Sequence, residues 1–286
     1  MPAKKGRPLS LRLFRSIATT SAMTLISRVL GFVRDIVIAN FFGASYLADA
    51  FFVAFRIPNF FRRLFAEGSF SQAFIPVLAE YKTQRPHQDV KALVERVAGT
   101  LAAVLLAVTI LTAVAAPVFV LVFAPGFSGH PEKAQLTAEM LRVTFPYLLF
   151  ISLAAFAGSI LNTYGRFGVP AFTPVFLNLS LIGAAFWLGP HLAQPAMALA
   201  WGVFIGGVAQ LAFQLPFLKR LGLLPRPRFG LGDPGVLGAN NIANVMGVFV
   251  PVSPFTTFRM DGWMTFTSVI SLFCLSTFTS KAGRPK

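Results

Sequence analysis

The sequence predicts an all-α fold, a polytopic transmembrane helical bundle of about six spans. Three observations indicate this class. Of the 286 residues, 55% are hydrophobic, and the mean hydropathy is +0.69. Charged residues make up 12% of the chain, against about 25% in soluble domains. Apolar runs of about 18 residues or more, long enough to cross a bilayer, recur along the sequence.

The predicted spans follow from these apolar runs and from the polar or Gly- and Pro-rich segments between them. They cover residues 16–42, 47–66, 97–123, 136–161, 169–188 and 196–218. We expect a kink at Pro58 and a break near Pro146, because proline removes a backbone donor from a helix. Residues 68–81 are expected to continue the second span as an amphipathic helix, and residues 82–96 to form a polar loop.

The chain divides into four predicted parts: a basic N-terminus (1–15), a six-helix lobe (16–218), a basic segment (219–234) and a divergent tail (235–286). Lysines and arginines gather in the N-terminus, in 82–96, at Arg166 and after the sixth span, whereas the opposite loops hold only Lys133. The positive-inside rule therefore predicts a cytoplasmic N-terminus. It also explains the net charge of +15 without a nucleic-acid partner.

The sequence offers little for catalysis or metal binding. It has one cysteine, Cys274, and three scattered histidines, His87, His130 and His191. This pattern predicts no disulfide, no metal site and no cofactor. There is also no nucleotide-binding motif or catalytic dyad, so we expect a protein that is not an enzyme.

Charged residues in the first two apolar spans and just after the second are the strongest functional signal. A charge inside a membrane costs roughly 2.5–3.5 kcal/mol on insertion scales, so it normally faces a partner or a water-filled cavity. Several in adjacent segments predict a cationic cavity that binds an anion. The charged residues are Arg28, Arg34, Asp35, Asp49, Arg56, Arg62, Arg63 and Glu67.

Helical spacing places some of these charges on common faces. Arg28 and Asp35 are seven residues apart, within about 20° on a helix. Arg34 shares a face with Arg28 only if the helix breaks locally, and Gly31 is the candidate for that break. Asp49 follows a turn, where a carboxylate complements the dipole of the next helix.

Simpler interpretations remain open for other residues. Arg62, Arg63 and Glu67 could instead mark the cytoplasmic end of the second span, with their side chains reaching the interface. Gly206 and Gly207 are expected to permit close helix packing.

Arginine favours a phosphorylated ligand, because guanidinium binds phosphate through two hydrogen bonds and stays charged at physiological pH. Within a membrane the natural ligand of this kind is a lipid pyrophosphate. A carboxylate such as Asp49 could pair with an arginine in the empty state and release it to the substrate.

Residues Ser27–Lys82 carry a specific combination of motifs: S-R-x-x-G-x-x-R-D, D-A-F-F-V-A-F, P-N-x-x-R-R-x-F-A-E-G and F-S-Q-A-F-x-P. This stretch closely resembles the MurJ/MviN family of lipid II flippases, in the multidrug/oligosaccharidyl-lipid/polysaccharide (MOP) exporter superfamily. The likeness continues through Ala124–Phe127, Phe145–Ala155, Ile160–Asn178 and Ala198–Pro216.

The resemblance implies transport of the lipid-linked peptidoglycan precursor from the cytoplasmic to the outer leaflet of the bacterial inner membrane, for cell-wall synthesis. The substrate would be the undecaprenyl-pyrophosphate-linked precursor, and membrane lipids would surround the helices. It implies substrate-binding roles for Arg28, Arg34, Asp49 and Arg62, with Glu67 alongside. The resemblance does not predict an oligomeric state.

The departure from the family pattern lies after Pro234. The family continues with a second bundle, whereas residues 235–286 change in composition, which we interpret as a frameshifted or otherwise aberrant end. We therefore expect a chain truncated to the N-terminal lobe. Two alternatives stay open: a transport-inactive membrane fragment, or an exporter of another lipid-linked saccharide or a drug.

Overall fold

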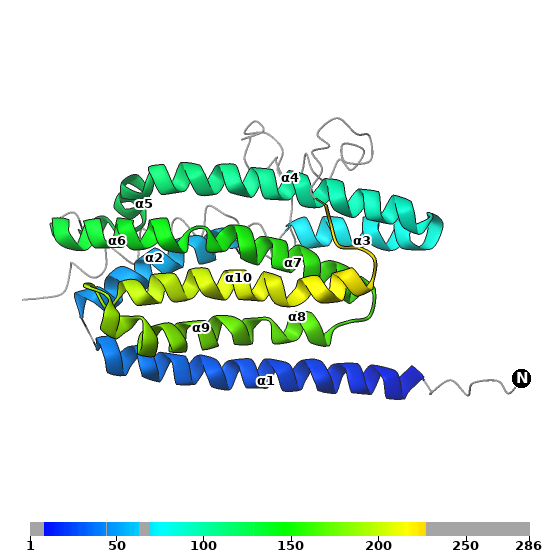
Figure 1. Ribbon diagram of the computed structural model, residues 1–286, viewed down its shortest axis with the longest axis horizontal. Coiled ribbons are helices and arrows are strands. Elements are labelled where there is room, and N and C mark those ends of the chain that lie inside the picture. The colour runs from blue at the N-terminus through cyan, green and yellow to red at the C-terminus, as the bar shows by residue number, and fades with distance from the viewer. Residues whose placement is uncertain (1–8, 44, 63–68, 128, 227–286) are drawn as a thin grey trace, which may run out of the picture. The chain divides into compact units, whose positions relative to one another are not determined.

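The computed structural model describes residues 9–43, 45–62, 69–127 and 129–226. The described residues form helices and short 3-10 turns and no strand, which confirms the predicted all-α class (Figure 1). The elements are α1 (Leu9–Phe42), α2 (Tyr46–Arg62), α3 (Ser69–Gln84), α4 (His87–Val114), α5 (Ala116–Phe123), η2 (Pro125–Phe127), α6 (Pro131–Thr144), α7 (Tyr147–Thr163), α8 (Gly168–Phe172), α9 (Pro174–Trp187), η3 (Gly189–His191) and α10 (Met197–Arg220).

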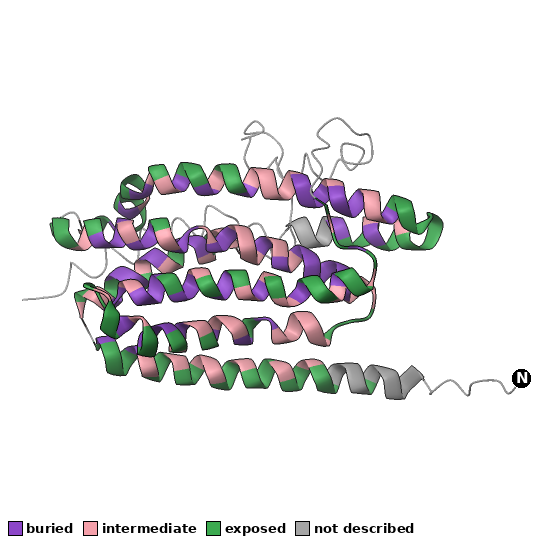
Figure 2. Ribbon diagram, in the orientation of Figure 1, coloured by how far each residue is buried: buried purple, intermediate pink, exposed green. Residues whose placement is uncertain are grey.

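The helices run alongside one another, and α10 is the central one. It packs against α7 on one side and α9 on the other, while α1 packs on α8 and α9, and α2 packs on α6. The buried side chains follow α6, α7 and α10, whereas α1 is exposed along most of its described length (Figure 2). The helix that carries Arg28 and Arg34 is therefore largely uncovered by the rest of the described bundle.

Four stretches of the described residues are long and apolar enough to cross a membrane: His87–Val114, Pro131–Thr163, Gly168–His191 and Met197–Arg220. They correspond to the third to sixth predicted spans. The first two predicted spans are also helical, as α1 with 34 residues and α2 with 17. At 1.5 Å per residue α1 is about 50 Å long, more than the ~30 Å hydrocarbon core of a bilayer.

The predicted polar loop at 82–96 is wrong. α3 continues to Gln84, and α4 begins at His87, which leaves only Arg85 and Pro86 between them. Several charged residues of this stretch are exposed, including Lys82, Arg85 and Asp89, whereas Glu95 is buried and approaches Lys91 at 4.0 Å. Their neighbours are buried in a core cluster with α3 and α7 (Val90, Leu93, Val94 and Val97). The polar residues in the first turns of α4 led to the prediction of a loop.

Other expectations about helix ends have mixed outcomes. The break near Pro146 is confirmed, since α6 ends at Thr144 and α7 begins at Tyr147. The break at Gly31 is wrong, because α1 is one continuous helix. The third span is divided at Ala115, just before Pro117. α2 runs through Pro58 as one helix.

Glycines on α10 bring it close to its neighbours, as predicted for Gly206 and Gly207. A Cβ at Gly206 would lie 2.9 Å from Leu177 Cδ1 of α9, and one at Gly207 would lie 2.8 Å from Tyr147 Cδ2 of α7. Ordinary contacts between carbon atoms are about 3.5–4.0 Å. Both positions therefore need glycine to keep these helices in contact.

Candidate functional site

The predicted site begins on α1 with two arginines in different surroundings. Arg28 is exposed and makes no hydrogen bond or ion pair with any described residue. Arg34 is half-buried: its Nε and Nη2 donate to Asp35 Oδ1 at 3.0 and 2.7 Å. Asp35 thus neutralises Arg34, whereas Arg28 keeps its charge available to a ligand.

Asn178 of α9 holds Arg34 from the other side, and sequence reasoning did not select it. Its Oδ1 accepts a hydrogen bond from Arg34 Nη1 at 3.0 Å, and its Nδ2 donates to the Ser27 carbonyl at 3.0 Å. The residue is buried against α1 beside Gly31. An amide in an apolar span four residues after a proline was the available signal. Asn178 therefore fixes the direction of the Arg34 guanidinium.

Asp49 lies in the first turn of α2, as its predicted dipole role requires. Its partner in the structure is Lys133 of α6, with Nζ donating to Asp49 Oδ2 at 2.8 Å. Lys133 Nζ also lies 4.3 Å from the centre of the Phe127 ring. Asp49 therefore pairs with a lysine in this conformation, while the arginines of α1 have other surroundings.

Arg62 ends α2, and its Nε donates to Asn59 Oδ1 at 2.8 Å. A cation in the last turn complements the helix dipole. Glu67 and Arg63 lie outside the described residues, as do residues 1–8 of the predicted N-terminus and the predicted tail at 235–286.

The sequence led us to expect a cationic cavity. The described charges of α1 and α2 do not line an enclosed cavity within the described part of this chain. Arg28, Asp35, Asp49 and Arg56 are exposed, and Asp35 and Asp49 show 61% and 64% of their side-chain surface. We call Arg28, Arg34, Asp35 and Asp49 the charged face. Apolar side chains beside it on α1 are exposed too, including Val29, Phe32 and Ile36. The charged face is therefore open in this chain.

Arg62 instead borders a hollow of about 510 Å³ that sequence reasoning missed. Its walls come from α7, the α8–α9 junction and α10. We call it the polar hollow, after the polar side chains that line it: Arg62, Ser159, Asn162, Thr173, Gln210 and Gln214. Two glutamines four residues apart in an apolar helix were the available signal, because that spacing puts them on one face.

Thr173 organises this hollow. Gln210 Nε2 donates to its carbonyl at 3.2 Å, and Gln214 Nε2 donates to its Oγ1 at 3.2 Å. Thr173 stands where α8 ends and Pro174 begins α9. The glutamines therefore bind a helix junction whose regular hydrogen-bond ladder the proline interrupts.

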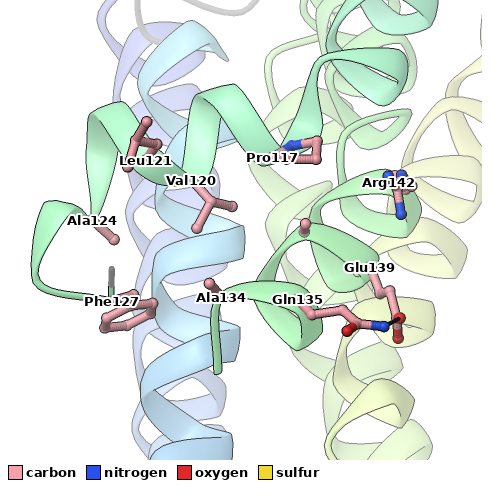
Figure 3. Close-up of a pocket in the computed structure, with 10 residues that line it drawn as sticks. Pro117, Val120, Leu121, Ala124, Phe127, Ala134, Gln135, Glu139 and Arg142 are labelled. Atoms are coloured by element: carbon pink, nitrogen blue, oxygen red, sulfur yellow. Dashed lines mark hydrogen bonds between the residues drawn. The ribbon is translucent and has the colours of Figure 1, made fainter. Parts of the chain in front are cut away.

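A second hollow, of about 500 Å³, lies between α5, η2 and α6 (Figure 3). Most of its wall is apolar, with Gln135, Glu139 and Arg142 on one side. Gln135 Nε2 donates to Glu139 Oε1 at 3.1 Å, and Arg142 Nε donates to the Ala113 carbonyl at 3.3 Å. It contains none of the predicted site residues. Gln135 and Glu139 bind each other, and Arg142 binds a backbone carbonyl.

Comparisons with known proteins agree with the resemblance. The family described as "Lipid II flippase MurJ" matches residues 38–258. The chain belongs to the MurJ family. It is 50% identical over 236 residues to the "Probable lipid II flippase MurJ" of Vibrio cholerae, covering 80% of this chain and 45% of the relative. It is 46% identical over 230 residues to the "Lipid II flippase MurJ" of Burkholderia cenocepacia, covering 79% of this chain and 45% of that one.

A solved structure shows the same fold. "Lipid II flippase MurJ, inward closed conformation" superposes with a TM-score of 0.63 at 28% identity, covering 81% of this chain and 46% of that one. The chain thus spans a little under half the length of the MurJ relatives it matches. Since the described residues include four helical stretches long and apolar enough to span a membrane, it is a multi-pass membrane protein of this family.

Proposed function

We propose that this chain supplies the N-terminal lobe of a lipid II flippase in the bacterial inner membrane. Membership of the MurJ family carries this proposal, since the matching relatives bear that name. The substrate would be the undecaprenyl-pyrophosphate-linked peptidoglycan precursor. Transport rather than catalysis agrees with a site made of arginines, carboxylates and amides.

In this proposal Arg28, Arg34 and Arg62 contact the pyrophosphate. Arg28 has no described partner and stands ready for an anion, whereas Arg34 must share its guanidinium with Asp35. Asp49 modulates the empty state, and its described partner for that role is Lys133. Glu67 is assigned alongside them on the strength of the family motif.

The basic ends of the helices support a cytoplasmic N-terminus. The α3–α4 turn with Arg85, the α7–α8 connection with Arg166 and the end of α10 with Lys219 lie at one end of the bundle (Figure 1). The α1–α2 turn and the α5–α6 connection, near Lys133, lie at the other. Cysteines placed at Arg166 and Lys133, in a Cys274→Ser background, should react with an impermeant thiol reagent from opposite sides of the membrane.

The decisive experiment measures binding of undecaprenyl pyrophosphate to the full chain in nanodiscs. We expect Arg28→Ala to weaken binding by about 10-fold or more, because a hydrogen bond to a charged group contributes about 1.5–3 kcal/mol. Arg56→Ala is the matched control, an exposed arginine on α2 outside the assigned set. Equal affinities for the two variants and the wild type would refute the assignment.

Transport itself is tested by complementing a flippase-depleted strain. Growth with the chain alone would show that this lobe suffices. Growth only with a second bundle supplied in trans would show that the lobe needs a partner surface. Failure of both, with the chain present in the membrane, would favour a transport-inactive fragment.

A further inference from the structure

The polar hollow has a chemistry that the pyrophosphate assignment does not use. Arg62 is its cation, and the other polar groups are uncharged hydroxyls and amides. Its volume of about 510 Å³ falls within the ~300–1,000 Å³ of small-molecule sites. The hollow is therefore suited to a neutral polar group that lies next to an anion.

In Gln210 and Gln214 the amide nitrogen makes a hydrogen bond, but the amide oxygen does not. Their Nε2 atoms are bound by Thr173, but neither Oε1 has a hydrogen-bond partner among the described residues. The two residues are only 2% and 1% exposed. An acceptor left unpaired at such depth costs about 1–3 kcal/mol, which a ligand donor would recover.

Gly158 of α7 leaves space beside one of these oxygens. A Cβ at this position would lie 3.6 Å from Gln214 Oε1 and 3.2 Å from Pro170 Cβ. Gly158 itself lines the hollow. Each oxygen exposes less than 1 Å², so a ligand hydroxyl reaches it after a small shift of the α7 wall.

The remaining hydroxyls make the hollow rich in acceptors. Ser159 Oγ donates to the Ala155 carbonyl at 3.0 Å, and Thr173 Oγ1 donates to the Val169 carbonyl at 3.2 Å. Their protons are thus committed to the helices. Ser159 Oγ keeps both lone pairs available, and Thr173 Oγ1, which accepts from Gln214 Nε2, keeps one. A matching ligand must bring hydrogen-bond donors, as sugar hydroxyls and acetamido N–H groups do.

We propose that the polar hollow binds the sugar portion of a glycosyl pyrophosphate lipid, with Gln210 and Gln214 as its acceptors. This inference rests on the proposed function and adds specificity to it. The charged face and Arg62 recognise the anionic part, which every polyprenyl pyrophosphate shares. The two glutamines distinguish a saccharide-bearing lipid from the bare pyrophosphate.

The test compares two lipids on the full chain in nanodiscs: undecaprenyl pyrophosphate and lipid II, which carries the disaccharide. Gln214→Leu should weaken lipid II binding by about tenfold, which corresponds to ~1.4 kcal/mol. Its affinity for undecaprenyl pyrophosphate should stay within about twofold of the wild type, because a neutral acceptor makes no contact with that lipid. Gln88→Leu, the same change at an exposed position of α4, should alter neither affinity.

Gly158→Ala keeps both glutamines and adds one methyl group against Gln214 Oε1. It should also weaken binding of lipid II and leave binding of undecaprenyl pyrophosphate unchanged. If Gln214→Leu fails to fold, Gly158→Ala and Gln210→Leu test the sugar subsite in its place. Wild-type chain that binds neither lipid would overturn the proposed function. Wild-type chain that binds both, with variants that lose both equally or neither, would overturn the sugar subsite alone.

Discussion

Two regions of this bundle hold their polar groups in opposite ways. On the charged face, Arg28, Asp35 and Asp49 are exposed, and Arg28 has no partner among the described residues. In the seam where α10 packs against α7 and α9, polar groups are uncharged, deeply buried and partly paired. The difference follows from desolvation, because burying a charge costs far more than burying an amide.

The two regions also differ in how tightly they are packed. Glycines let α10 approach α7 and α9 closely, whereas α1 leaves Val29, Phe32 and Ile36 exposed beside its charges. Lipid can cover the apolar side chains of α1, but the charge of Arg28 beside them still requires a ligand or water. We infer that stability resides in the seam and ligand affinity in the charged face.

The largest expected effect is on the seam. Gly206→Val should lower the free energy of unfolding by about 3 kcal/mol or more, because overpacking forces backbone shifts. The new Cβ would lie 3.1 Å from Leu177 Cα, which a rotamer change cannot relieve. Denaturant unfolding in detergent measures the loss.

Gly183→Ala is the matched control for that change. Gly183 lies on α9, and an added Cβ there meets nothing within 4 Å. Its replacement should be neutral or stabilising by up to about 1 kcal/mol, the difference in helix propensity. Similar losses for both variants would show that close packing of the seam does not determine stability.

A smaller effect is expected where the two regions meet, at Asn178. Asn178→Asp keeps the shape of the side chain but gives Arg34 a second carboxylate beside Asp35. Undecaprenyl pyrophosphate should bind about tenfold more weakly, a loss of ~1.4 kcal/mol. Binding titrations in nanodiscs provide the measurement.

Asp35→Asn tests the same role of Arg34, with the opposite expected change in affinity for undecaprenyl pyrophosphate. It removes the carboxylate that neutralises Arg34 and keeps the hydrogen-bonding shape. The anion should then bind more tightly than in the wild type. If Asn178→Asp strengthened binding, or Asp35→Asn weakened it, Arg34 would not be the anion contact that we assign.

The seam and the charged face also differ in how far the sequence predicts them. Close packing at Gly206 and Gly207, the break at Pro146 and the position of Asp49 in a first helical turn follow from local rules about glycine, proline and the helix dipole. All three are found in the structure.

The misses concern tertiary neighbours. The polar start of α4 was mistaken for a loop, since only its packing on α3 and α7 reveals the buried side. The role of Gln210 and Gln214 depends on Thr173, a residue 37 positions from Gln210 in the chain. The predicted cationic cavity stays a prediction: Arg28 is exposed on α1, and a cavity there requires a surface opposite α1, which sequence periodicity does not describe.

The smallest expected effect belongs to the ion pair between Lys133 and Asp49. Asp49 shows 64% of its side-chain surface, and exposed ion pairs contribute about 0.2–1 kcal/mol. Lys133→Gln, Asp49→Asn and the double variant should therefore show a coupling below about 1 kcal/mol that falls further in high salt. Unfolding of the four proteins in detergent at low and high ionic strength measures it.

A coupling above about 2 kcal/mol, insensitive to salt, would place Asp49 in a desolvated site and make the charged face resemble the seam. A small coupling leaves Asp49 free to exchange its partner at little cost, as its proposed role in the empty state requires.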